Sequence, residues 1–216
     1  MAEIFVVGHR NPDNDAIMSA SVLADLKNKL DGDNHYKAVR LGPLPAESEL
    51  VFSEFGVEAP ELIDHVDEGQ KIILTDHNEL GQAVAGIDKA EIVEIVDHHR
   101  IADVSTAAPI TFINLPLGST CSIITKIFDY YGIEIEKDAA ARLLAAVLTD
   151  TVILKSPTAT KEDRAIVERL SAIVGVDPVE FGMKLFKSRG GDDDVTVEEI
   201  CSRDSKEFNF GGKKVW

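Results

Sequence analysis

The stretch Ile95-Val96-Asp97-His98-His99-Arg100 decides the fold, because an apolar run ends there abruptly in a carboxylate and two imidazoles. The preceding residues, 92–96, are mostly apolar, as expected of a strand covered on both faces in an α/β sheet. In open α/β sheets, ligands bind in the crevice beyond the carboxyl ends of the strands. The pattern therefore favours a ligand site at this strand end over histidines that only hydrogen-bond a loop.

Two further strands are predicted to end in the same kind of side chain. Residues 3–7 precede Gly8-His9-Arg10-Asn11-Pro12-Asp13-Asn14-Asp15, and residues 71–75 precede Asp76-His77-Asn78-Glu79. Parallel strands deliver their ends to one edge of a sheet, and strand–helix alternation with right-handed crossovers favours the parallel arrangement. We expect an α/β fold with a mainly parallel sheet, helices on both faces, and three ligand-bearing strand ends that converge.

The other expected elements follow from apolar periodicity and turn residues. Strands are expected at 36–41 and 110–115, and helices over 47–55, 120–131, 138–150, 160–173 and 178–186. A further helix is expected directly after the first motif, with residues at helical spacing from Ser19 to Leu30 and with Asp13 or Asp15 placed to cap it. His35 and His65 lie in turn-rich surroundings and are interpreted as surface or structural residues. Gly118-Ser119-Thr120 opens one helix, where simple capping is favoured over phosphate binding.

Asp150 is expected on the apolar face of its helix, because Leu143, Val147 and Asp150 fall at i, i+4 and i+7. Burying an ionised acid without a partner is prohibitive, so Asp150 needs a basic neighbour or a metal ion. The other acid and histidine clusters favour a metal ion.

Composition limits the classes of function. The chain has 216 residues and a net charge of −16, which repels phosphate backbones, so nucleic-acid binding is disfavoured and an anionic substrate would need metal ions. Its two cysteines, Cys121 and Cys201, form no metal-binding pair. No apolar run approaches the ~20 residues of a membrane span and no signal peptide is recognised, so a cytoplasmic protein that does not bind membranes is expected.

The only break in composition is Ser188-Arg189-Gly190-Gly191 with the acids that follow it. We expect a metal-binding catalytic domain over residues 1–189. Residues 190–216 are expected to be a linker and the start of a second, truncated domain, with a short helical piece and a strand at 208–210.

Six residues make up the predicted site: His9, Asp13, Asp15, Asp76, His98 and Asp150. Four carboxylates and two imidazoles are too many for one divalent ion but suit two ions that share a carboxylate, and the mixed ligands suit Mn²⁺, with Co²⁺ or Zn²⁺ as competitors. Two such ions ~3.5–4 Å apart would activate a water for in-line attack on phosphorus. His99, beside a predicted ligand, is free to touch the substrate.

These motifs resemble the family II inorganic pyrophosphatases of the DHH phosphoesterase superfamily. The resemblance rests on the three strand-end motifs, on Gly118-Ser119-Thr120, and on Leu148-Thr149-Asp150-Thr151 followed by Lys155-Ser156-Pro157-Thr158. The family pattern usually has Thr where this chain has Asn14. That change removes no ligand.

The resemblance implies hydrolysis of pyrophosphate to two phosphates, with two Mn²⁺ or Co²⁺ ions per chain and Mg²⁺ accompanying the substrate. One ion would be held by His9, Asp13 and Asp76, and the other by Asp15, Asp76, His98 and Asp150, with Asp76 bridging. Asp76 and His99 would be catalytic, and His99 would also contact the substrate. A homodimer formed through the first domain is implied as well.

The carboxyl end carries a further expectation from the resemblance. The stretch around Lys206 resembles the opening strand of the family's second domain, and Lys206 matches a lysine that binds substrate phosphate. That domain continues in the family for about a hundred residues, a typical small-domain length, so we expect hydrolysis by this chain to be impaired. The regulatory nucleotide-binding insert of some members is not expected, since only a loop and a strand separate residues 55 and 76.

Two alternatives remain open. The first is another DHH phosphoesterase, acting on short oligonucleotides, cyclic dinucleotides or polyphosphate. The net negative charge and the motif Asn11-Pro12-Asp13 disfavour it. The second is a metal-binding module without turnover, which tight Mn²⁺ binding without hydrolysis would favour.

Overall fold

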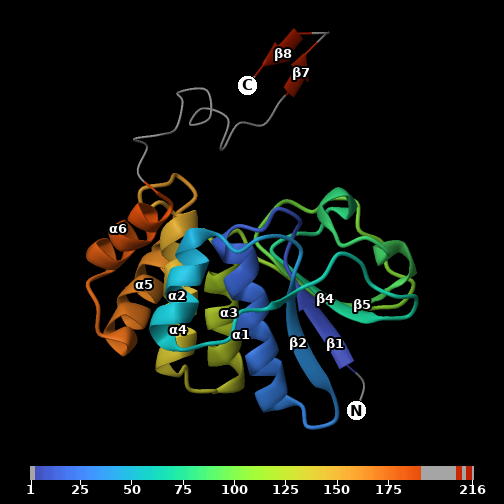
Figure 1. Cartoon of the computed structure of the whole chain (residues 1–216), viewed down its shortest axis with the longest axis horizontal. Coiled ribbons are helices and arrows are strands. Elements are labelled where there is room, and N and C mark those ends of the chain that lie inside the picture. The colour runs from blue at the N-terminus through green and yellow to red at the C-terminus, as the bar shows by residue number, and fades with distance from the viewer. Residues whose placement is uncertain (1–2, 191–207, 211–212, 216) are drawn as a thin grey trace.

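The computed structural model describes residues 3–190, 208–210 and 213–215. Its main feature is one parallel sheet with the strand order β3-β2-β1-β4-β5-β6 (Figure 1). The strands are β1 Glu3–Val7, β2 His35–Arg40, β3 Glu61–Leu62, β4 Lys71–Thr75, β5 Glu91–Asp97 and β6 Thr111–Asn114. The three ligand-bearing strands β1, β4 and β5 are neighbours, so their carboxyl ends meet at one edge, as predicted.

The α-helices gather on one side of this sheet (Figure 1). They are α1 Asn14–Leu30, α2 Ala46–Phe55, α3 Thr120–Tyr131, α4 Lys137–Asp150, α5 Lys161–Val174 and α6 Pro178–Ser188. The buried strand residues Val6, Ile73 and Val96 share one apolar core with these helices. Helices α1 and α3 contact the strands, and α4 packs behind them against α1 and α5. Burial of this apolar surface provides the main stabilisation of the fold.

A smaller core covers the opposite face of the sheet. There Val7, Leu74 and Ile95 pack against Val66 and Val84 from connecting loops. Strands β2 and β3 are added on one side of β1, and β4, β5 and β6 are added on its other side. Right-handed crossovers between β4, β5 and β6 therefore run over this second face. These connections contain only the 3-10 helices η1 Leu80–Gln82 and η2 Ile87–Lys89. The α/β class and the parallel sheet are confirmed. The α-helices expected on this second face are not found among the described residues, where short turns and loops cover the sheet instead.

Local signals set the helix ends close to where the sequence predicts them. Asp13, rather than Asp15, caps α1 by accepting from the Ala16 amide at 2.9 Å. Helix α2 ends at Gly56, whose φ of 65° is the left-handed conformation that glycine tolerates. Thr160 and Asp163 form a complete capping box at the start of α5.

Strands β7 Phe208–Phe210 and β8 Lys213–Val215 form a separate antiparallel pair. The strand expected at 208–210 is therefore present. Lys206, Cys201 and most of the expected linker lie outside the described residues, and the division of the chain at residue 190 stays a prediction. Within the described part of the chain, no helix is both long enough and apolar enough to cross a membrane.

Candidate metal centre

The loops that follow β1, β4 and β5 bring three predicted ligands together around Asp76. His9 Nε2 lies 3.5 Å from Asp76 Oδ2 and 3.7 Å from Asp13 Oδ2. On the other side of the carboxylate, His98 Nε2 lies 3.4 Å from Asp76 Oδ1. Each oxygen of Asp76 thus faces a different histidine.

Two helices complete the cluster, because α1 contributes Asp15 in its first turn and α4 contributes Asp150 as its last residue. Asp150 Oδ2 lies 3.5 Å from His98 Nε2. Potential ligand atoms of Asp15, His98 and Asp150 all lie within 4.8 Å of one another, as do those of a second group, His9, Asp13 and Asp76. The structure therefore brings all six predicted ligand residues together, in two adjacent groups that meet where His98 faces Asp76.

The backbone at Asp76 is strained in a way that positions its side chain. Its φ is 61°, in the left-handed region that non-glycine residues seldom adopt. The Asp76 amide donates to the Val96 carbonyl at 3.0 Å, and the Thr120 hydroxyl donates to Asp76 Oδ1 at 2.9 Å. These contacts fix the buried carboxylate of Asp76 between His9 and His98.

Both candidate histidine ligands are oriented through their second ring nitrogen. His9 Nδ1 lies 2.8 Å from the Arg10 carbonyl and His98 Nδ1 lies 2.9 Å from the Leu117 carbonyl. A carbonyl only accepts, so Nδ1 carries a hydrogen, and once the ring is neutral the lone pair of Nε2 points toward the acids, where a metal ion would bind. Metal-binding histidines have this arrangement.

The amino end of α3 binds the Asp15 carboxylate. Asp15 Oδ1 accepts from Ser119 Oγ at 2.8 Å and from the Cys121 amide at 3.1 Å, and Oδ2 accepts from the Thr120 amide at 2.7 Å. Ser119 also caps the helix. The capping interpretation is therefore confirmed, and the amides considered for phosphate bind the chain's own acid.

The charges in the cluster indicate that it is built for cations. Burial, followed by the charge of Asp76, raises the pKa of Asp15 to about 7. Burial and the charges of Asp15 and Asp76 raise the pKa of Asp150 to about 9. Asp150 Oδ2 is also buried without a hydrogen-bond partner. A divalent ion beside these oxygens would offset the repulsion between the carboxylates and give Asp150 Oδ2 a partner, so the donor set fits metal binding.

The imidazoles bind protons when no cation is present. Burial lowers the pKa of His9, but its contacts with the carboxylates of Asp13 and Asp76 outweigh burial and raise the pKa to about 11. The pKa of His98 rises to about 10, again against burial, chiefly through Asp76. Protons and metal ions therefore compete for the same Nε2 atoms.

His99 lies beside Asp76, with Nδ1 3.7 Å from Asp76 Oδ1, and is held by a carboxylate that is not among the predicted site residues. Its Nδ1 lies 2.9 Å from Oδ1 of the fully buried Asp97, and its amide donates to the same oxygen at 3.1 Å. Asn78 donates to the other oxygen of Asp97 and to the Arg100 carbonyl. The contact leaves His99 Nε2 free. The sequence signal for Asp97 and Asn78 was their place in the motifs at the carboxyl ends of β5 and β4.

Asn14 and Asp163 also support the site without touching a predicted ligand. The Asn14 side chain accepts from Ser48 Oγ at 2.8 Å and donates to Thr149 Oγ1 at 3.1 Å, tying α1 to α2 and α4. Asp163 accepts from the Gly118 amide at 3.0 Å, which anchors the loop before α3. His35 and His65 are exposed and lie outside the cluster, as predicted.

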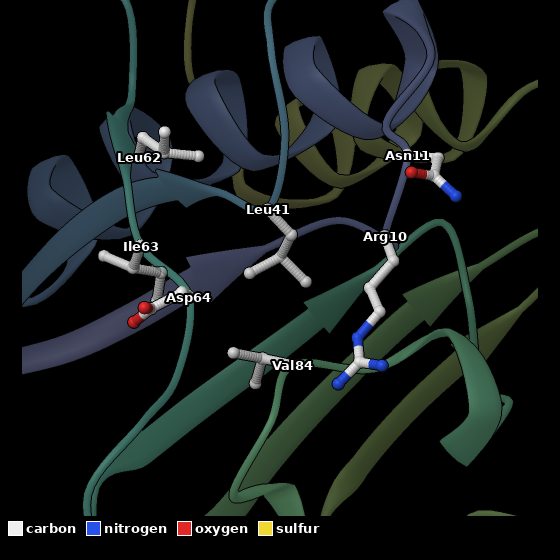
Figure 2. A pocket seen from close by; sticks show the side chains of 7 residues that line it. All are labelled: Arg10, Asn11, Leu41, Leu62, Ile63, Asp64 and Val84. Carbon is white, nitrogen blue, oxygen red and sulfur yellow. The ribbon is translucent and has the colours of Figure 1, made fainter.

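Two cavities flank the ligand loops. Figure 2 shows the first, of about 540 Å³, in which Arg10 extends toward Val84 while Leu62, Ile63 and Asp64 lie on the opposite wall. It contains none of the six predicted ligands. The second, of about 470 Å³, is lined by both His98 and His99 and by Asp150, together with Pro116, Leu117, Gly118, Ser156 and Thr158. The second cavity therefore gives access to the cluster.

Comparisons with known proteins agree with this geometry. A sequence model described as the DHH family, N-terminal domain, matches residues 3–149. The manganese-dependent inorganic pyrophosphatase of Methanothrix thermoacetophila is 43% identical over 211 residues, which cover 98% of this chain and 67% of that protein. The manganese-dependent inorganic pyrophosphatase of Bacillus subtilis is 41% identical over 216 residues, covering 100% of this chain and 69% of that protein.

Solved structures show the same relationship. A crystal structure from Methanococcus jannaschii, described as a family II inorganic pyrophosphatase, superimposes with a TM-score of 0.82 at 37% identity, covering 98% of this chain and 69% of that one. An exopolyphosphatase-related protein from Bacteroides fragilis shares the fold, with a TM-score of 0.65 at 18% identity over 86% of this chain and 56% of that one.

Proposed function

This chain belongs to the DHH family and, within it, to the manganese-dependent inorganic pyrophosphatases, and on that premise we propose that it hydrolyses pyrophosphate to two phosphates at the cluster around Asp76. The observation that carries the proposal is the pair of adjacent ligand groups, one of which includes the buried Asp76, while His98 of the other faces the second oxygen of that carboxylate. Such a pair suits two ions that act on one phosphoanhydride.

We assign one ion to His9, Asp13 and Asp76 and the other to Asp15, Asp76, His98 and Asp150. The names of the relatives support Mn²⁺, and Mg²⁺ is proposed to accompany the substrate. When bound, the two ions supply positive charge that acidifies an attacking water and neutralises phosphoryl oxygens. The raised pKa values of the histidines mean that both rings release a proton before they bind an ion.

His99 is proposed to contact the substrate. Its Nδ1 is held by Asp97, so its Nε2 remains available for a phosphate oxygen. The hydrogen bond to Asp97 raises the pKa of His99, which favours the protonated ring and hence a hydrogen bond to an anion. Lys206 stays a predicted phosphate contact outside the described residues.

A homodimer in the cytoplasm is part of the same proposal. Strand β6 is an edge of the sheet and exposes the side chain of Phe112 by 42%. An edge strand with exposed apolar side chains can pair with its counterpart in a second copy. The buried free thiol of Cys121 suits a reducing compartment, and the net charge of −16 disfavours nucleic acid as a partner. Light scattering that gives the monomer mass at micromolar concentration would refute the dimer.

One preparation can test the function against its alternatives. Phosphate release is measured from pyrophosphate, polyphosphate and a short oligonucleotide, with Mn²⁺ and Mg²⁺ supplied, for the wild type and for Asp76→Asn. We expect release from pyrophosphate that requires Mn²⁺ and is lost in the variant. Preferential cleavage of the oligonucleotide or polyphosphate would indicate another DHH phosphoesterase. Tight Mn²⁺ binding with no product from any substrate would indicate a metal-binding module.

A further inference from the structure

The segment that follows Asp150 has an unusual backbone. Val152, Ile153 and Leu154 have φ values of 50°, 52° and 60°, so three consecutive non-glycine residues adopt the left-handed conformation. Side chains disfavour this conformation, most strongly the β-branched ones of valine and isoleucine. Strain of this kind persists where the surroundings determine it and is concentrated at functional sites.

The surroundings do determine this left-handed turn. The Ile153 amide donates to the Leu148 carbonyl at 2.7 Å, and the Leu154 amide donates to Thr151 Oγ1 at 3.1 Å. Ile153 packs against Gly182 of α6, where an added Cβ would lie 2.7 Å from Ile153 Cγ1. The turn is therefore held from both α4 and α6.

The consequence of the turn is the placement of the residues that follow it. The Ser156 amide donates back to the Thr151 carbonyl at 2.8 Å, which folds the chain over the end of α4. Ser156 and Thr158 then line the cavity of about 470 Å³ beside His98 and His99. These hydroxyls belong to the motif Lys155-Ser156-Pro157-Thr158, to which the metal centre itself gives no role.

A count of hydrogens shows that one hydroxyl proton is available. Ser156 Oγ and Thr158 Oγ1 lie 2.6 Å apart and share one hydrogen bond. Ser156 Oγ also accepts from the Thr158 amide at 3.3 Å. Two hydroxyls carry two protons and their mutual bond uses one, so the other can be donated into the cavity. Ionised phosphate oxygens are acceptors only and need such donors.

We propose that Ser156 and Thr158 form a phosphate-binding subsite of the metal centre, in which the pair donates one hydroxyl hydrogen bond to a phosphoryl oxygen of the substrate. This inference rests on the proposed function, because it assumes a substrate that carries phosphoryl groups. An uncharged donor is suited to this wall, since it binds the anion without competing with metal ions for the nearby carboxylate of Asp150.

Binding of a non-hydrolysable analogue tests the subsite directly. Methylene diphosphonate is titrated by calorimetry into the Mn²⁺-loaded protein, for the wild type, for Ser156→Ala combined with Thr158→Val, and for the conservative Thr158→Ser. The control is Ser53→Ala, which removes an exposed hydroxyl on α2. Mn²⁺ affinity should be the same in all four, because none of the changes removes a ligand.

We expect the dissociation constant of the analogue to rise about tenfold or more in the double variant, the usual effect of losing a hydrogen bond to a charged group. Thr158→Ser and Ser53→Ala should bind like the wild type. An unchanged constant in the double variant would overturn the subsite, and so would a wild type that fails to bind the analogue at millimolar concentration.

Hydrolysis of pyrophosphate, measured on the same proteins, separates this inference from the proposed function. A substrate contact should raise KM in the double variant by a similar factor and change kcat less. If the analogue binds through the hydroxyls but no protein releases phosphate, the subsite stands and the proposed function fails. If all variants hydrolyse pyrophosphate with the wild-type KM, the function stands and the subsite is refuted.

Discussion

The hydroxyl of Thr120 should control how well the centre binds manganese. Thr120→Val removes the hydrogen bond to Asp76 Oδ1 and keeps the shape of the side chain. The two oxygens are 2.9 Å apart, and the residues are 0% and 2% exposed, so water has no access to replace the lost donor. Asp76 would then keep its charge but lose the contact that fixes the orientation of its carboxylate.

The size of the effect follows from the charge of the acceptor. A hydrogen bond to a charged group contributes about 1.5–3 kcal/mol, and loss of a partner that orients a metal ligand typically costs roughly 10–100-fold in affinity. We therefore expect the free energy of unfolding of the metal-free protein to fall by about 1.5–3 kcal/mol. The Mn²⁺ dissociation constant should rise by about one to two orders of magnitude.

The assay is a titration of metal-free protein with Mn²⁺, in which the electron paramagnetic resonance signal reports free ion. The matched control is Thr125→Val on the same helix, whose fully buried hydroxyl donates to the Cys121 carbonyl at 2.9 Å and touches no acid. Wild-type Mn²⁺ affinity in Thr120→Val would refute the reasoning. Equal weakening in Thr125→Val would show that the effect comes from helix packing.

Three further predictions concern pH, the left-handed turn and a buried cap. The pKa values of His9 and His98 are raised from 6.5 to about 11 and about 10, so the stability that the two protonated rings contribute is complete below pH 6.5 and is lost toward pH 10–11. The metal-free protein should therefore become less stable to urea as the pH rises. A stability that stays constant or increases with pH would contradict this. Val152→Gly should leave the melting temperature unchanged or raise it. The substitution relieves about 1–2 kcal/mol of left-handed strain at this half-exposed site, which exceeds the ~0.5–1 kcal/mol that glycine costs. A clear fall in the melting temperature measured by calorimetry would argue against the strain. Asp163→Asn should lower the free energy of unfolding in urea by about 2 kcal/mol or more, since the buried Asp163 carboxylate accepts from two backbone amides. The control Glu162→Gln, one residue away and exposed, should lower it little. Equal losses of stability in the two variants would rule out the cap.

The architecture of the site was accessible from sequence because its signals are local. Each of the strands β1, β4 and β5 is an apolar run followed at once by acids and histidines, and parallel strands share an edge. Asp150 was identified because an acid on an apolar helical face needs a partner, and the structure places it 3.5 Å from His98. These steps require only periodicity and the cost of burying charge.

Contacts between distant segments were beyond the sequence. The Ser119 hydroxyl could have capped its helix or bound phosphate, and only the fold shows that it donates to Asp15, 104 positions away. Asp163 was expected as part of a capping box, yet it also accepts from Gly118, 45 positions earlier. A local pattern gives the chemistry of such a side chain, while the packing of helices decides its second partner.

The left-handed turn was missed for a different reason. Left-handed residues are usually signalled by glycine or asparagine, but Val152, Ile153 and Leu154 favour other conformations. Tertiary contacts override that preference, including the space that Gly182 leaves for Ile153. The short cover of the second sheet face was hidden similarly, because connection length alone did not reveal how little helix the crossovers contain.

The claim that two ions share Asp76 is tested most directly by counting manganese. Metal-free protein is dialysed against Mn²⁺ and protein-bound metal is determined for the wild type and for Asp76→Asn. We predict close to two equivalents per chain in the wild type and at most one, weakly held, in the variant, because the six ligand residues exceed one coordination sphere and both proposed ion sites include that carboxylate. One equivalent in the wild type that persists unchanged in Asp76→Asn would contradict the account.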